Sequence, residues 1–261
     1  MKREFILGYP KQFLLNYLAR TCNRVGYGAA QLYTPIQGDK NGFKAFADLF
    51  DGLTGEAFFK RREELEKSHT DIHPIPYFAY EREDGSLYLY QRGKEIEEGR
   101  LAGDDSIAPG GHVEQKDAVE GIQFVSYLHA FVAALDNWLS YGSDLQAMIT
   151  AILREAHEEV GLVPVVNNAM INTDAFGFRF VGALYDESND VGLRHLGLLF
   201  VIRIPNNMDV RSKEKVILDR GFHQPADLLF TNEHGAIKLE NWSKVFLEHL
   251  IVEKTATANN A

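Results

Sequence analysis

One acidic stretch, Arg154–Leu162 (REAHEEVGL), constrains this chain more than any other part of its sequence. As a helix end, it places three carboxylates within five residues. Glu155 and Glu159 are four residues apart and share one helical face, with Glu158 beside them. Like charges this close repel, whereas a hard divalent cation such as Mg²⁺ or Mn²⁺ binds such oxygens. Gly161 suits the left-handed position that ends a helix. The stretch therefore predicts a metal-binding helix end.

A pair of glycines lies upstream, at Gly110-Gly111 within the segment Ser106–Glu114 (SIAPGGHVE). Glycine has no Cβ, so a glycine pair lets the backbone come close to a metal ion or a phosphate group. The apolar residues before the pair predict that the chain re-enters the core there. We expect the acidic helix end to face this glycine turn.

The two stretches resemble the two halves of the Nudix box, the signature of MutT-like pyrophosphohydrolases. Ser106–Glu114 is similar to its Gly-Gly-x-x-Glu opening, and Arg154–Leu162 to its second half. Two departures matter. Asp117 stands where the box has Glu, and Arg154 lies 43 positions after Gly111 instead of 14, so 29 residues are extra. The resemblance implies a Nudix-type α/β/α sandwich with a mixed central sheet and a helical insertion that splits the box.

A narrower resemblance, from about Phe58 to Leu250, is to a branch of predicted MutT-type phosphoesterases. That branch shares the Gly-Gly-His segment and a Val-Gly-x-x-His-Leu-Gly segment, here Val191–Gly197. The first fifty residues show no such likeness.

The resemblance implies hydrolysis of a diphosphate linkage in a nucleoside diphosphate derivative by a metal-activated water. It implies Mg²⁺ or Mn²⁺ as the cofactor. Glu155 and Glu159 would be the principal metal ligands, with Glu158 a third and the Gly111 carbonyl a further one. One of these carboxylates, or a loop carboxylate such as Glu187, would act as the general base. The sequence does not choose among them, and it does not identify the substrate.

Other residues have a functional and a structural interpretation side by side. Arg154 is expected to steady the carboxylates through charge-assisted hydrogen bonds. Arg92, where a strand leaves the sheet, is either a phosphate contact or a solvent-facing strand end, and Gly110 would line the substrate. Glu187, in an acidic loop after a strand, is either a further metal-binding or base carboxylate or part of a plain turn. Glu214 is a weaker candidate for the same role.

Two other functions fit the same motif. A Nudix-fold protein can sense a nucleotide without cleaving it, although such proteins often lose a carboxylate of the box and this chain keeps all three. An isomerase of the isopentenyl-diphosphate type shares the fold but needs an active-site cysteine. The single cysteine, Cys22, lies far from both half-motifs.

Composition sets further bounds. The chain has 261 residues and 45% apolar content, which is enough for one core. We expect one domain, 1–261, with an N-terminal elaboration over about 1–70 and the insertion over about 115–143. The net charge of −10, with no basic stripe, argues against nucleic-acid binding. One cysteine fits a reducing cytoplasm, and no apolar run is long enough to span a membrane. An apolar helical stripe in the insertion predicts packing on the parent domain, with a homodimer surface or a lid as alternatives.

Periodicity predicts the main elements. Residues 43–67 are expected to be helical, and a loop is expected around Gly26, Gly28 and Pro35. A hairpin is expected around Asp84-Gly85. The acidic helix is expected from about Ser143 to Val160 and a final helix from Glu240. Strands are expected over 178–185, 195–204 and 210–219.

Overall fold

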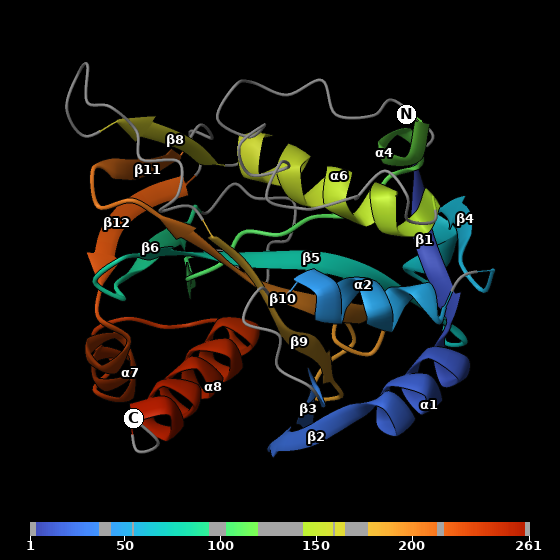
Figure 1. The fold of residues 1–261 in the computed structure, drawn as a ribbon, viewed down its shortest axis with the longest axis horizontal. Coiled ribbons are helices and arrows are strands. Elements are labelled where there is room, and N and C mark those ends of the chain that lie inside the picture. The colour runs from blue at the N-terminus through green and yellow to red at the C-terminus, as the bar shows by residue number, and fades with distance from the viewer. Residues whose placement is uncertain are drawn as a thin grey trace. The chain divides into compact units, whose positions relative to one another are not determined.

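The computed structural model describes residues 4–36, 43–53, 55–93, 103–119, 143–158, 160–164, 177–212 and 217–258 (Figure 1). The chain divides into two compact units. The first comprises Met1–Phe78, Gly110–Glu155 and Gly177–Val201. The second comprises Ala79–Pro109, Ala156–Phe176 and Ile202–Ala261. The prediction of one domain over 1–261 stays a prediction.

The first unit combines helices and strands from the N-terminal region and the middle of the chain. Its complete elements are β1 (Phe5–Pro10), α1 (Lys11–Thr21), β2 (Cys22–Tyr27), β3 (Ala30–Pro35), α2 (Phe43–Asp51), β4 (Phe58–Arg61), α3 (Arg62–Leu65), α4 (Gln115–Val119) and β9 (Gly177–Asp186). It also contains most of β5 (Asp71–Arg82), α6 (Ser143–Glu158) and β10 (His195–Ile204). The strand order is β5-β10-β9-β3-β2, and β1 pairs with both β4 and β5.

The core of the first unit is aromatic. Phe46 of α2 is fully buried, and its ring lies 4.8 Å from Phe50, 5.1 Å from Phe180 and 5.0 Å from Phe200. Ring pairs at these separations stabilise a core beyond the apolar area they bury. The contacts fix α2 against β9 and β10, so the sheet that carries these strands has a rigid support.

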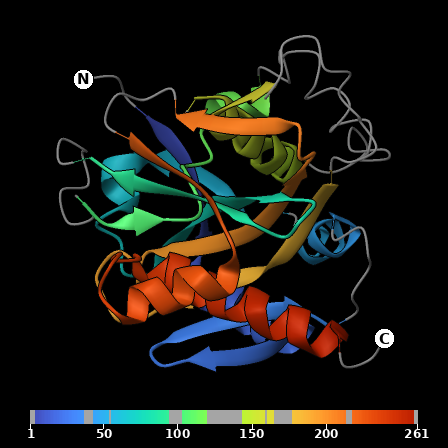
Figure 2. The same ribbon diagram turned by 90° about the vertical axis from the view of Figure 1, so that its left-hand side faces the viewer.

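The second unit contains β6 (Leu87–Arg92), β7 (Asp105–Ser106), β8 (Val160–Pro164), β11 (Met208–Ser212), β12 (Ile217–His223), α7 (Pro225–Glu233) and α8 (Asn241–Ala258). β6 lies between β12 and the end of β5, and β7 also pairs with β6. β8 and β11 form a separate antiparallel pair. The two helices α7 and α8 lie side by side (Figures 1 and 2).

Several predicted elements are confirmed, as is the mixed α/β class. β5 and β6 flank the Asp84-Gly85 turn, where Gly85 has a φ of +81° that favours glycine. The acidic helix is α6, and the strands expected over 178–185 and 195–204 are β9 and β10. The final helix is α8, in which Val245, Phe246 and Leu250 are buried as expected.

Four predictions were wrong in part. The acidic helix, expected to run to about Val160 and to end at Gly161, ends at Glu158, because Val160 and Gly161 belong to β8, which pairs with β11. Residues 58–61, expected to be helical, form β4, because they pair with β1 in the register Phe5↔Arg61. The loop expected around Gly28 is the turn of the β2–β3 hairpin, where Gly28 has a φ of +63°. The single strand expected over 210–219 takes in the end of β11 and the start of β12, which pair with β8 and β6 respectively.

The predicted helical insertion begins with α4, and its residues 120–142 lie outside the described residues. Its packing and any role in a dimer therefore stay predictions. Among the described residues, no helix combines the length and the apolar character that a membrane span requires.

Candidate active site

The glycine turn is held in place by two strands of the first unit. Gly110 forms an isolated antiparallel bridge with Tyr77 on β5. Two residues after Gly111, the carbonyl of Val113 accepts a hydrogen bond of 2.8 Å from the amide of Leu7 on β1. Backbone pairing on both sides fixes the path of the turn, so the groups that the turn presents have defined positions.

Gly111 brings the backbone against the acidic helix. A Cβ built on Gly111 would overlap the carboxylate of Glu155, the first glutamate of the acidic stretch. A Cβ on Gly110 would lie 2.5 Å from the carbonyl oxygen of Pro76 and 3.0 Å from the ring of Tyr77. Backbone blocks a side chain at Gly110, whereas a Cβ at Gly111 would displace the Glu155 side chain. The glycine turn therefore meets the acidic helix at Glu155, as predicted.

Arg154 forms hydrogen bonds with residues of both half-motifs. Its Nε donates to Asp117 Oδ1 at 2.9 Å and its Nη2 to Asp117 Oδ2 at 3.0 Å, a bidentate pair. Its Nη1 donates to Glu155 Oε1 at 2.7 Å, and its Nη2 also donates to the carbonyl of His112 at 2.8 Å. The expectation that Arg154 steadies a carboxylate through charge-assisted hydrogen bonds is therefore confirmed for Glu155.

This network is buried. Arg154 is 6% exposed, Asp117 3% and Glu155 8%. Burial by itself lowers the pKa of Arg154, but hydrogen bonds and charges from Asp117 and Glu155 outweigh that effect and raise it. The guanidinium is therefore permanently charged, and it pairs with both carboxylates. Asp117, which replaces the Glu of the family pattern, is a partner of Arg154.

The structure describes the side chain of only one of the other predicted carboxylates, Glu187. The side chains of Glu158 and Glu159 lie outside the described residues, as does Glu214. Glu187 follows β9 and is exposed. Burial is the main cause that raises the pKa of Tyr185 to about 12, and the charge of Glu187 and a hydrogen bond to it add to this shift. β9 ends beside the start of β3, and the amide of Glu187 donates to the carbonyl of Ala29 at 3.3 Å. The structure therefore brings Glu155 to the glycine turn, and the role of Glu187 stays a prediction.

Arg92 lies in the second unit and contacts a buried carboxylate. Its Nη2 lies 3.3 Å from Glu240 Oε1, and Glu240 is 6% exposed. Ser106, which is fully buried, also donates to Glu240. The side chain of Arg92 is 18% exposed. The contact with Glu240 supplies a structural role for Arg92, and its role as a phosphate contact stays a prediction.

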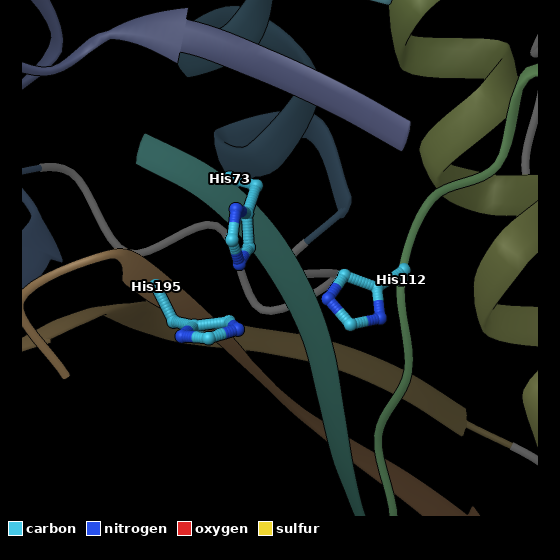
Figure 3. Close-up of side chains that lie close together, drawn as sticks. All are labelled: His73, His112 and His195. Atoms are coloured by element: carbon cyan, nitrogen blue, oxygen red, sulfur yellow. The ribbon is translucent and has the colours of Figure 1, made fainter. Parts of the chain in front are cut away.

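The sequence did not predict a cluster of three histidines in the first unit. The ring of His112, next to Gly111, lies close to those of His73 on β5 and His195 at the start of β10 (Figure 3). The residues come from three segments far apart in the chain, and no local spacing connects them. The only available signal was that His112 and His195 both stand in segments shared with the phosphoesterase branch.

Comparison with known proteins places the fold. No protein-family model matches the chain. Protein YmaB of Bacillus subtilis (strain 168) is 26% identical over 190 residues, 73% of this chain and 76% of YmaB. The crystal structure of Tm1382, a candidate Nudix hydrolase, superposes with a TM-score of 0.56 at 19% identity, covering 95% of this chain and 98% of Tm1382. A NUDIX hydrolase from Alicyclobacillus acidocaldarius gives 0.46 at 15% identity, covering 68% and 90%. The likeness to Tm1382 confirms the predicted Nudix-type α/β fold.

Proposed function

We propose that this chain, which has a Nudix-type fold, is a divalent-metal-dependent hydrolase that cleaves a diphosphate linkage in a nucleoside diphosphate derivative. The observation that carries the proposal is the approach of the Gly111 backbone to the Glu155 carboxylate. It is the approach that the two half-motifs predict, and the Arg154–Asp117 pair maintains it despite the residues between them.

The described residues fit a hard divalent cation such as Mg²⁺ or Mn²⁺. The Glu155 carboxylate lies against a turn that carries no Cβ, so backbone oxygen and carboxylate oxygen can approach one ion. Glu155, Glu158, Glu159 and the Gly111 carbonyl are the residues that would hold it. When bound, such a cation offsets the charge of a diphosphate and lowers the pKa of a coordinated water.

The protein's own residues have distinct roles in this proposal. Arg154 orients Glu155, because its guanidinium is hydrogen-bonded to both Asp117 and Glu155. The general base is the carboxylate that reaches the attacking water, either one of the acidic stretch or Glu187. Gly110 and Arg92 are the proposed substrate contacts. A buried carboxylate held by a fixed hydrogen bond needs little reorganisation during a reaction.

A substrate panel tests the proposal. Dinucleoside polyphosphates, nucleotide sugars, NAD⁺ and oxidised nucleoside triphosphates would be incubated with the full chain and Mg²⁺ or Mn²⁺, and the release of AMP or phosphate measured. Glu155→Gln should lower turnover by at least about 100-fold, the lower range for the loss of a catalytic acid or base. Glu63→Gln, an exposed glutamate on α3, is the matched control. Wild-type turnover in Glu155→Gln would contradict the assignment.

Cys22 separates this proposal from an isomerase. Cys22 is buried at the start of β2, and burial raises the pKa of its thiol. A catalytic cysteine requires the opposite shift, since the thiolate is the nucleophile.

If a nucleotide binds without being hydrolysed, the alternative of a nucleotide sensor replaces the hydrolase. A cytoplasmic location and a homodimer are further parts of the proposal, and light scattering of the purified chain tests the latter.

A further inference from the structure

The three-histidine cluster lies next to the candidate active site but uses different donor atoms. The rings of His73 and His195 are 3.9 Å apart and nearly perpendicular, and His112 lies 5.2 Å from His73 and 5.8 Å from His195. One ring nitrogen from each histidine can be chosen so that all three lie within 4.8 Å of one another. Figure 3 shows the three rings converging from β5, β10 and the segment after the glycine turn.

His73 is in an unusual state for a buried polar side chain. It is 1% exposed, and neither of its ring nitrogens has a hydrogen-bond partner. The Nε2 atom of His112 is also buried without a hydrogen-bond partner. Buried polar atoms in folded proteins are nearly always paired, so an unpaired group of this kind requires an explanation, such as the binding of an ion. Two such imidazoles face each other here.

The third histidine is oriented in the way that metal-binding histidines commonly are. The Nδ1 atom of His195 lies 2.7 Å from the carbonyl oxygen of Val191. A carbonyl can only accept, so Nδ1 carries the proton and Nε2 carries the lone pair. A backbone carbonyl bonded to the other ring nitrogen is a frequent second partner of a metal-binding histidine, because it fixes both tautomer and ring orientation.

The positive charges near the three rings are largely paired. They come from Arg62, Arg154 and Arg194. Arg62 is paired with Glu4 and Glu66, and Arg154 with Asp117 and Glu155, which reduces their repulsion of a metal ion.

We propose that His73, His112 and His195 form a binding site for a borderline transition-metal ion, with Zn²⁺ as the reference ion. Imidazole nitrogen favours zinc, cobalt and nickel over magnesium, whose preferred ligands are oxygens. Zinc–nitrogen bonds are about 2.0–2.1 Å long, so two nitrogens on one tetrahedral ion are about 3.3 Å apart. The cluster therefore contracts slightly when the ion binds. Three protein ligands leave a fourth position open for water or another small ligand.

This site is separate from the carboxylate site of the proposed hydrolase. Its donors are neutral nitrogens rather than charged oxygens, so the two sites select different ions. The further inference therefore does not depend on the proposed function, and either can fail alone.

Metal titration of the full chain tests the proposal. After dialysis against a chelator, the protein would be titrated with Co²⁺, whose visible absorption reports tetrahedral nitrogen coordination, and then with Zn²⁺. We expect one tightly bound ion per chain, displacement of Co²⁺ by Zn²⁺, and no displacement by excess Mg²⁺. Absence of Co²⁺ and Zn²⁺ binding would overturn the proposal, as would complete displacement by Mg²⁺.

Variants identify the ligands. His195→Ala should lower the affinity for Zn²⁺ by at least about 100-fold, because loss of even an outer partner of a ligand costs 10–100-fold. His112→Ala should have the same effect, and His73→Ala as well if it folds. The matched control is His69→Ala, since His69 is exposed four residues before His73. Wild-type affinity in His195→Ala would refute the assignment even if His73→Ala does not fold.

Discussion

Replacing Arg154 by methionine removes a cation that contacts both halves of the candidate site. Methionine has a similar length and no charge, so the packing changes little while four hydrogen bonds are lost: two to Asp117, one to Glu155 and one to the His112 carbonyl. Two carboxylates then remain buried with no cation between them. Asp117 is 3% exposed and Glu155 is 8% exposed, so water compensates for neither.

The expected loss of stability follows from this burial. Removing one partner of a buried ion pair destabilises a protein by about 3–5 kcal/mol, because an uncompensated charge stays inside. For a chain of this size, each kcal/mol shifts the melting temperature by about 2–4 °C. Arg154→Met should therefore melt roughly 6–20 °C below the wild type. Urea unfolding, followed by tryptophan fluorescence and far-ultraviolet circular dichroism, measures the free energy directly.

Arg62→Met is the matched control. Arg62 also bonds two carboxylates, Glu66 at 2.7 Å and Glu4 at 3.0 Å, but its side chain is 36% exposed. Exposed ion pairs contribute about 0–1 kcal/mol each, so this variant should lose at most about 2 kcal/mol. The cycle that combines Arg154→Met with Asp117→Asn adds a second check, because the double variant should lose less than the sum of the single losses. Equal losses in Arg154→Met and Arg62→Met would refute the argument that burial sets the effect.

Three further predictions concern other positions. Gly111→Ala should abolish hydrolysis of whichever nucleotide the panel identifies, because its Cβ displaces the Glu155 carboxylate. Gly26→Ala should retain activity, because its Cβ would make only ordinary contacts with Gln31, at 3.9 Å and beyond. In metal-free protein, burial and then neighbouring positive charge lower the pKa of His73, so the unfolded chain binds more protons below pH 6.5 and stability falls as the pH drops. His73→Gln should remove about 1.4 kcal/mol per pH unit from that slope in urea unfolding below about pH 5.5, where the imidazole of the unfolded chain is almost fully protonated, and an unchanged slope would contradict it. Cys22, 8% exposed with a thiol pKa raised by burial, should react slowly with a disulfide reagent in native buffer and rapidly in denaturant.

The sequence predicted those elements whose signals are local. The Asp84-Gly85 turn has a backbone requirement that glycine meets, and its flanking strands alternate as a hairpin does. The acidic helix was predictable because its buried face repeats with helical spacing, and Leu145, Ile149 and Ile152 are all buried.

The errors arose where a distant partner decides the structure. Residues 58–61 contain charged side chains that suit a helix, yet they pair with β1, which precedes them by more than fifty residues. Strand formation depends on such partners more than on intrinsic preference. The histidine cluster has the same origin, because pairing of β5 with its neighbours, not any spacing in the chain, brings His73 to His112 and His195.

The chain between the two half-motifs is long, but its extra loop-closure entropy is small compared with the cost of losing the contacts that join them. Arg154 and Asp117 are 37 positions apart, and removal of the 29 extra residues would leave 8, since 37 − 29 = 8. Loop-closure entropy grows only with the logarithm of length, so closing the longer loop costs about 1.4 kcal/mol more, from (3/2)RT ln(37/8). Removal of a buried guanidinium costs about 3–5 kcal/mol, because it leaves its carboxylate partners uncompensated. A planar group with donors in a fixed fork can bind the Asp117 carboxylate at two points and still reach Glu155, which a lysine ammonium cannot do. The expected cost of losing the Arg154 network therefore exceeds the entropic cost of the longer loop, so Asp117 and Glu155 can stay joined across the residues between them.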